Sequence, residues 1–324
     1  MKTAIAQISP VFLDRIKTTS KVIDTINEAA NAGCKLVAFG EAFLPGYPVW
    51  LACTDGARFD DSAQKAMHAL YMQQAVSIEE GHLKDVVEAS TKGDIMVVLG
   101  IVERPADRGG HSLYCSCVII DPALGIVSVH RKLMPTYEER LSWGIGDGHG
   151  LKTHRIGEFT LGALNCWENW MPLARAALYA QGENLHIAIW PGCERNTRDI
   201  TRFIAQESRS FVMSASAVLT ERDIECGLPS DLLLGFPHRG LIVAAAAEAG
   251  SYNGGSCIAG PDGQFVVAPV LDTEGIIVTE LDFARVSEER QNFDPSGHYS
   301  RPDVLSLSVS KARQSAMRFV EPRQ

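Results

Sequence analysis

The sequence lacks long apolar runs. None of its 324 residues belongs to a stretch that reaches the roughly 18 consecutive apolar residues of a membrane-spanning helix. The N-terminal segment MKTAIAQISP carries one lysine and an apolar run of about five residues, which is shorter than the apolar core of a signal peptide. These absences predict a cytoplasmic protein without a membrane partner.

Basic residues are fewer than acidic ones. The chain has 30 Lys and Arg against 39 Asp and Glu, a formal net charge of -9 and a pI near 5.5. Because nucleic acids and anionic membranes are bound through basic surfaces, this balance argues against a nucleic-acid partner. A small neutral molecule fits the charge balance better.

The eight cysteines form neither CxxC pairs nor a recognisable disulfide framework, and no zinc-site spacing is present. We therefore expect free thiols and no zinc site; the chemistry predicted below also needs no metal or organic cofactor. Repeats, low-complexity tracts and interdomain linkers are also missing. These features predict one domain over residues 1–308, followed by a short C-terminal tail over residues 309–324.

Strands and helices alternate along the chain. The pattern begins with a strand at Thr3–Ile8, a helix at Arg15–Asn31 and a buried strand at Leu36–Phe39. Two further helices are predicted near Ser62–Ser77 and Ile78–Lys92. Alternation of this kind is typical of layered α/β folds, in which ligands bind beyond the carboxyl ends of strands.

The stretch LGALNCWENWMPLAR has the pattern of an exposed nucleophile. Leu161 to Asn165 predicts a short buried strand, Cys166 follows at its carboxyl end, and Pro172 suits the first turn of a helix. Backbone N–H groups of the intervening turn can lower the pKa of a thiol and stabilise negative charge on a reacting atom. A buried structural cysteine is the alternative.

Two charged residues also follow predicted strands. Glu41 comes directly after a buried strand, and Lys132 lies near the end of the strand Ile126–Leu133, last of three basic residues that begin at His130. A solvated strand edge is the alternative for these basic residues. If the strand ends meet, Cys166 is the nucleophile, Glu41 the base and Lys132 a cation that lowers the pKa of the thiol.

The segment Ala42–Asp61 is rich in proline, glycine and aromatic residues. Long loops inside compact domains are commonly functional, which predicts that Pro45, Tyr47, Pro48 and Trp50 lie in a pocket or on its rim. A loop that packs its own aromatic side chains is an equally good interpretation for Trp50.

Three other cysteines are predicted to be structural rather than catalytic. In the predicted strand SLYCSCVIID, alternation places Cys115 and Cys117 on the same apolar face as Leu113 and Ile119. Cys193 also follows a predicted strand, but it has no acid–base pair of its own. We interpret all three cysteines as structural.

Three segments occur in order along the chain, GEAFLPGYP around Glu41, HRKLMPTYEER around Lys132 and NCWENWMPLAR around Cys166. In these motifs the chain resembles the nitrilase superfamily of carbon–nitrogen hydrolases, and within it the nitrilase branch. The resemblance continues to SGHYSRPDVLSL at residues 296–307. The Cys-Trp-Glu tripeptide is similar to nitrilases, whereas amidase branches more often have Cys-Tyr-Asp.

This resemblance implies a four-layer α-β-β-α sandwich with a mixed two-sheet core, where periodicity alone predicts only a mixed α/β domain. It also implies a homo-oligomer built from dimers, with the helix after Cys166 as a candidate dimer surface. Many relatives carry a longer C-terminal tail that is associated with helical assembly. The short tail after residue 308 therefore gives no reason to expect a long filament.

Further site residues follow from the resemblance. Glu139 matches a second glutamate of the family, which orients Lys132 or the attacking water; a surface carboxylate paired with Arg140 or Arg131 is the alternative. The positions implied to contact substrate are Tyr47, Pro48, Thr136, Trp143, Trp167 and Trp170. Trp170 is equally compatible with the core.

The predicted activity is hydrolysis of an organic nitrile to a carboxylic acid and ammonia, through a thioimidate and an acyl-thioester on Cys166. An amide-releasing or amide-hydrolysing enzyme of the same superfamily is the alternative, and a non-catalytic oligomeric scaffold is a third possibility. The aromatic lining favours an aliphatic or arylaliphatic nitrile over cyanide itself.

Overall fold

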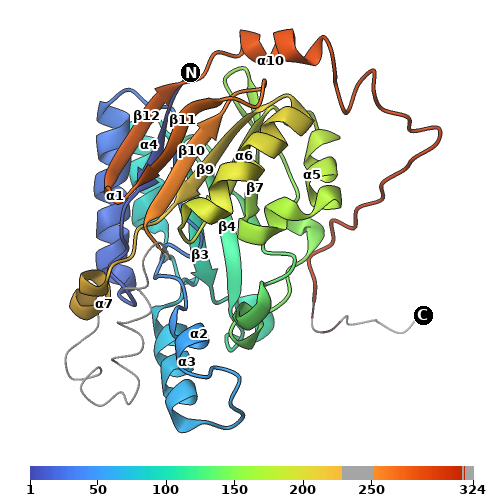
Figure 1. The fold of residues 1–324 in the computed structure, drawn as a ribbon. Helices are drawn as coiled ribbons and strands as arrows, with labels where there is room; N and C mark the ends of the chain where they lie inside the picture. Colours follow the sequence, from blue (N-terminus) through green and yellow to red (C-terminus); the bar gives the residue numbers. More distant parts are fainter. Residues whose placement is uncertain (228–251, 316, 318–324) are drawn as a thin grey trace, which may run out of the picture.

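The computed structural model describes residues 1–227, 252–315 and 317, which form two facing sheets with helices on both outer faces (Figure 1). One sheet has the strand order β12-β1-β2-β3-β4-β5 and the other β11-β10-β9-β8-β7-β6. The predicted four-layer sandwich is confirmed.

The first sheet is parallel at its centre and antiparallel toward both edges. β1 pairs in parallel with β2, and β2 with β3, whereas the other neighbours run antiparallel. β2 and β3 are buried along their whole lengths, as expected for strands covered on both faces. The strands are β1 (Lys2–Gln7), β2 (Leu36–Phe39), β3 (Met96–Glu103), β4 (Tyr114–Asp121), β5 (Gly125–Arg131) and β12 (Gly275–Glu280).

The second sheet repeats this arrangement. β7, β8 and β9 are parallel, and antiparallel strands complete both edges. The strands are β6 (His154–Ile156), β7 (Phe159–Asn165), β8 (Leu185–Trp190), β9 (Phe211–Ser216), β10 (Gly254–Ala259) and β11 (Phe265–Leu271). Ile5 and Val98 from the first sheet pack against Ile187 and Met213 from the second, so the main core lies between the sheets.

Helices cover the two outer faces. α1 (Arg15–Asn31) and α4 (Lys84–Gly93) pack on the first sheet, and α6 (Glu194–Ser208) packs on the second beside α5 (Pro172–Tyr179) (Figure 1). The other α-helices described are α2 (Trp50–Cys53), α3 (Ser62–Gln74), α7 (Glu221–Gly227) and α10 (Ala284–Arg290). Within the described residues, no helix is both long and apolar enough to cross a membrane.

The predicted helix Ile78–Lys92 is wrong in its first half. α4 begins only at Lys84, because the preceding residues form turns and Gly81 adopts a φ of 79°, which a helix interior does not accept. Trp50 fits both interpretations of its segment. It is 1% exposed and packs edge-on against Tyr71 of α3, with ring centroids 4.8 Å apart, and it also lines the hollow described next.

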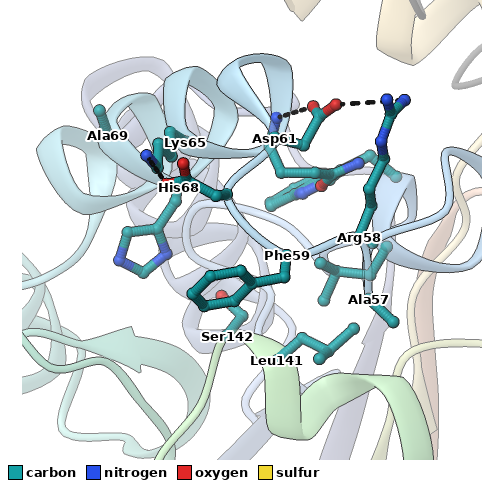
Figure 2. A pocket seen from close by; sticks show the side chains of 14 residues that line it. Ala57, Arg58, Phe59, Asp61, Lys65, His68, Ala69, Leu141 and Ser142 are labelled. Carbon is teal, nitrogen blue, oxygen red and sulfur yellow. Dashed lines mark hydrogen bonds and ion pairs between the residues drawn. The ribbon is translucent and has the colours of Figure 1, made fainter.

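A hollow of about 370 Å³ lies on the outer side of this loop, between α3 and the 3-10 helix η2 (Tyr137–Leu141) (Figure 2). Phe59, His68, Leu141 and Ser142 line it, and Phe59 is 97% exposed. No residue predicted to be catalytic lines this hollow, although η2 also carries Glu139.

The C-terminal segment returns to the end of β5. Arg313 Nη1 lies 3.2 Å from Asp147 Oδ1, and the backbone N–H of Gln314 donates to Asp147 Oδ2 at 2.9 Å. The neighbouring Gly146 N–H donates to the carbonyl of Lys132 at 2.9 Å. The described part of the predicted tail therefore contacts the loop that follows Lys132; residues 316 and 318–324 lie outside the described residues.

Candidate active site

Glu41 lies at a direct contact between the two sheets. Its backbone N–H donates to the carbonyl of Trp190, the last residue of β8, at 3.0 Å. A Cβ on Gly100 would lie 2.2 Å from the carbonyl oxygen of Gly40, so only glycine allows β3 to pass so close to this turn. The carboxyl end of β2 is thereby fixed beside the carboxyl ends of the second sheet's parallel strands.

The three basic residues at the end of β5 are buried, and each has its own acidic partner. His130 Nε2 lies 2.9 Å from Glu168, Arg131 Nη2 lies 2.8 Å from Glu103, and Lys132 Nζ contacts two carboxylates. All three basic residues are at most 3% exposed. The interpretation of these residues as a solvated strand edge is wrong, because their side chains are buried. The acidic partners are what allows the charges to be buried.

Lys132 lies between two glutamates. Its Nζ is 2.8 Å from Glu41 Oε1 and 2.7 Å from Glu139 Oε2, and all three side chains are almost completely buried. Glu139 also accepts hydrogen bonds from the Tyr47 hydroxyl at 2.8 Å and from the Thr136 backbone N–H at 2.6 Å. Glu139 is therefore not the surface carboxylate of the alternative interpretation.

Cys166 begins the 3-10 helix η4 (Cys166–Trp170), directly after β7. Its φ of 46° lies in the left-handed region, which is uncommon for a residue other than glycine. The side-chain amide of Asn169 donates to the Cys166 carbonyl at 2.8 Å, and the backbone N–H of Trp167 hydrogen-bonds the sulfur. These contacts hold Cys166 in its turn.

Oxygen atoms of Glu41 and Glu139 and the sulfur of Cys166 all lie within 4.8 Å of one another. Such donors can hold a metal ion. In this site, however, the Lys132 ammonium already contacts both carboxylates. The arrangement therefore carries a cation of its own beside the thiol.

Burial and charge determine the protonation states. Burial raises the pKa of Glu41 to about 7, although Lys132 opposes the rise. Burial alone would lower the pKa of Lys132, but Glu41, Cys166 and Glu139 together raise it well above its usual value. The ammonium therefore stays charged while the neighbouring carboxyl of Glu41 can gain or lose a proton near neutrality.

The expected low pKa of Cys166 is wrong. Burial raises the pKa of this thiol well above its usual value, and the negative charge of Glu41 adds to the effect. Lys132 and the Trp167 N–H act in the predicted direction but do not compensate. The Cys166 thiol therefore keeps its proton unless a base removes it.

The residues predicted to bind substrate fall into two groups. Tyr47 and Trp143 pack edge-on, with ring centroids 5.7 Å apart, and Trp143 lies 5.7 Å from Lys132 Nζ. Thr136 contacts Glu139, and Pro48 is buried beside Tyr47. Trp167 and Trp170 are instead 50% and 43% exposed, so the interpretation of Trp170 as a core residue is wrong.

Sequence reasoning missed Glu168. Its carboxylate accepts hydrogen bonds from His130 Nε2 at 2.9 Å, the Leu133 N–H at 2.8 Å and the Asn165 N–H at 2.9 Å. It thus links the segment after Lys132 to the residue before Cys166. The spacing Asn165-x-x-Glu168 is a capping-box pattern and could have indicated this role.

Sequence reasoning also missed a second chain of polar side chains, which begins at Asn169 and contacts the Cys166 carbonyl through it. Asn169 Oδ1 is 2.7 Å from His186 Nε2, and His186 Nδ1 is 2.8 Å from Glu183. All three side chains are buried. Residues of this kind are difficult to assign from sequence, because Glu183 and His186 come from a different part of the chain.

Replacing Glu168 with glutamine is expected to lower the free energy of unfolding by about 1–3 kcal/mol, because an amide NH₂ would face donors that now meet a carboxylate. Urea unfolding at fixed protein concentration measures the change. Glu194→Gln is the control, since the ion pair of Glu194 with Arg198 is long and exposed, and it is the one ion pair of this carboxylate among the described residues. Equal stabilities of the two variants would contradict a linking role for Glu168.

Comparisons with known proteins identify the family of this chain. Residues 2–291 match the family model described as carbon-nitrogen hydrolase. An aliphatic nitrilase of Rhodococcus rhodochrous is 35% identical, covering 96% of this chain and 82% of the relative. An aliphatic nitrilase of Sinorhizobium fredii is 34% identical, covering 98% and 97%.

A crystal structure of another protein has a similar fold. Nit3 of Saccharomyces cerevisiae, described as a member of branch 10 of the nitrilase superfamily, aligns with a TM-score of 0.67 at 16% identity. The alignment covers 92% of this chain and 96% of that one. The chain therefore belongs to the nitrilase superfamily of carbon–nitrogen hydrolases.

Proposed function

We propose that this hydrolase is a nitrilase, which converts an organic nitrile to the carboxylic acid and ammonia. The observation that carries the proposal is the buried group of Cys166, Glu41 and Lys132 at the meeting strand ends. It unites a thiol, a base that titrates near neutrality and a permanent cation. A nitrile carbon is a weak electrophile and needs all three.

In the proposed first step, Glu41 removes the proton of Cys166 as the sulfur attacks the nitrile carbon. The proton passes to the nitrile nitrogen, which gives a thioimidate. Lys132 stabilises the negative charge that develops during attack, because its ammonium is fixed beside Glu41 in a buried site. The Cys166 thiol, protonated at rest, becomes nucleophilic only when substrate and base are both in place.

In the proposed later steps, water adds to the thioimidate with Glu41 as base, and the nitrogen leaves as ammonia after protonation. A second water hydrolyses the resulting acyl-thioester, releasing the acid and the Cys166 thiol. Glu139 Oε2 also contacts the Lys132 ammonium, at 2.7 Å, and thereby orients it. If the carbon–sulfur bond of the water adduct breaks before the carbon–nitrogen bond, the product is instead the amide.

The aliphatic nitrilase names of two relatives and the aromatic pair Tyr47–Trp143 support an aliphatic or arylaliphatic nitrile as substrate. A panel of aliphatic, aromatic and arylaliphatic nitriles, the matching amides and cyanide tests this, with acid and amide products quantified separately. Acid from nitriles supports the proposal. Turnover of amides alone or of cyanide alone would contradict it.

The pH dependence of kcat/KM should report the ionisation of Glu41. Since only the ionised carboxylate can accept the thiol proton, kcat/KM is expected to fall below about pH 7, by roughly tenfold per pH unit. Rates measured between pH 5 and 9 at constant ionic strength check this expectation. A profile that stays flat down to pH 5 would contradict Glu41 as the base.

We also propose that the chain forms dimers through the face made by η4, α5 and α6. Exposed apolar side chains gather there, namely Trp170, Met171, Leu173 and Phe203. Leu173 is 68% exposed, and Leu173→Glu is expected to weaken dimerisation by about tenfold to a hundredfold. Sedimentation velocity measures this, with Ile16→Glu on α1 as the control; equal effects of both variants would contradict this interface.

A further inference from the structure

The thiol of Cys115 faces the catalytic base. Cys115 lies in β4 and is fully buried, as its apolar pattern predicts. Its Sγ is nevertheless only 3.3 Å from Glu41 Oε1 and 3.9 Å from Asn165 Oδ1. The Lys132 backbone N–H donates to the Cys115 carbonyl at 2.8 Å, so the sheet itself holds this cysteine beside the site.

The two oxygens of Glu41 have different surroundings. Oε1 contacts both Lys132 Nζ at 2.8 Å and the Cys115 thiol. Oε2 is buried and has no hydrogen-bond partner among the described residues. A buried carboxylate oxygen without a partner is costly, which indicates an atom reserved for a proton that arrives during the reaction.

The protonation of Cys115 fits a donor role. Burial and the nearby charge of Glu41 raise the pKa of this thiol well above its usual value, so it keeps its proton. Of the two acceptors within reach, Glu41 is the nearer and the one that carries charge. A hydrogen bond from Cys115 also opposes the rise in the pKa of Glu41.

We propose that Cys115 is a positioning residue, whose thiol donates to Glu41 Oε1 and leaves Oε2 free to take the proton of Cys166. The proposal rests on the proposed function, in which Glu41 is the base. Other titratable groups also act on Glu41. They are Lys132, Glu139, Cys166, Tyr47, Tyr71 and Cys117. All of them stay unchanged in the test except Cys117, which makes no hydrogen bond to Glu41 among the described residues and therefore serves as the control.

The test compares Cys115→Ala, Cys115→Val and Cys115→Ser. The first two remove the donor, and valine suits a strand should alanine not fold. The control is Cys117→Ala, because Cys117 is a buried cysteine of the same strand that packs in the core between the sheets. Two readouts are measured against pH, kcat/KM for the best nitrile and the rate at which iodoacetamide alkylates Cys166, located by mass spectrometry.

Loss of the donor is expected to raise the pKa of Glu41 and to move the acidic limb of both profiles upward by about 0.5–1 pH unit. Cys115→Ser should keep the limb at or below its wild-type position, since a hydroxyl also donates. Cys117→Ala should leave it in place. The proposal is overturned if the acidic limb of Cys115→Ala or Cys115→Val coincides with that of the wild type. It is also overturned if the acidic limb of Cys115→Ser moves to higher pH.

The two proposals can fail separately. If neither nitriles nor amides are hydrolysed, the proposed function is wrong, whereas the alkylation profiles still decide the role of Cys115. If nitriles are hydrolysed and the profiles do not move, Cys115 is a core residue and the nitrilase proposal is unaffected.

Discussion

Replacing Lys132 with methionine is expected to abolish detectable turnover and to lower the free energy of unfolding by about 3–5 kcal/mol. The ammonium is fully buried and is the cation between Glu41 and Glu139. Without it, two carboxylates would face each other in a site that excludes water. The variant therefore loses both the group that stabilises developing charge and the partner of two buried acids.

Urea unfolding and ammonia release measure the two effects. Lys35→Met is the control for stability, because Lys35 forms an exposed pair with Asp94 that is worth about 0–1 kcal/mol. Since oligomerisation shifts apparent stability, all variants are compared at one protein concentration. Equal unfolding midpoints for the two variants would contradict the buried cluster described above.

Replacing Glu41 with glutamine is expected to reduce turnover by about 10²–10⁴-fold while changing stability at neutral pH by less than about 1 kcal/mol. The Lys132–Glu139 pair remains balanced in this variant. Glutamine cannot take the thiol proton, so the chemistry is lost although the charge cluster survives. Kinetics with the best nitrile and urea unfolding together separate these outcomes.

The sign of the pH effect on stability follows from the raised pKa of Glu41. Because this pKa is about 7 in the folded protein and about 4.5 for an ordinary glutamate, the protonated carboxyl stabilises the fold. That contribution is fully present below about pH 4.5 and is lost as the pH rises through about 7. Glu41→Gln should remove this dependence; destabilisation at neutral pH as large as that of Lys132→Met would contradict the description.

The main elements of the site could be predicted because strand ends are readable in the sequence. Glu41, Lys132 and Cys166 each follow or end a strand pattern, and the carboxyl ends of parallel strands lie at one edge of a sheet. Periodicity alone did not predict that the strands divide into two sheets. That division depends on long-range pairings, such as β1 with β12, which separate sequence segments do not specify.

The electrostatics could not be predicted in the same way. The basic residues from His130 to Lys132 carry the pattern of a surface edge, and only the fold brings Glu168, Glu103 and Glu41 to them. The pKa of Cys166 depends on burial, which outweighs the cation beside it. The contact of Cys115 with Glu41 likewise arises from the position of β4 next to the Glu41 turn and is invisible in an apolar strand pattern.

The measurement that tests the proposed activity most directly is release of ammonia and acid from an aliphatic nitrile by the wild type, Cys166→Ala and Cys193→Ala. Cys193 precedes α6 at the end of β8, so it controls for loss of a nearby thiol. We expect equimolar acid and ammonia from the wild type and from Cys193→Ala, and none from Cys166→Ala. Turnover by Cys166→Ala, or its absence in the wild type across all nitriles, would contradict nitrile hydrolysis through Cys166.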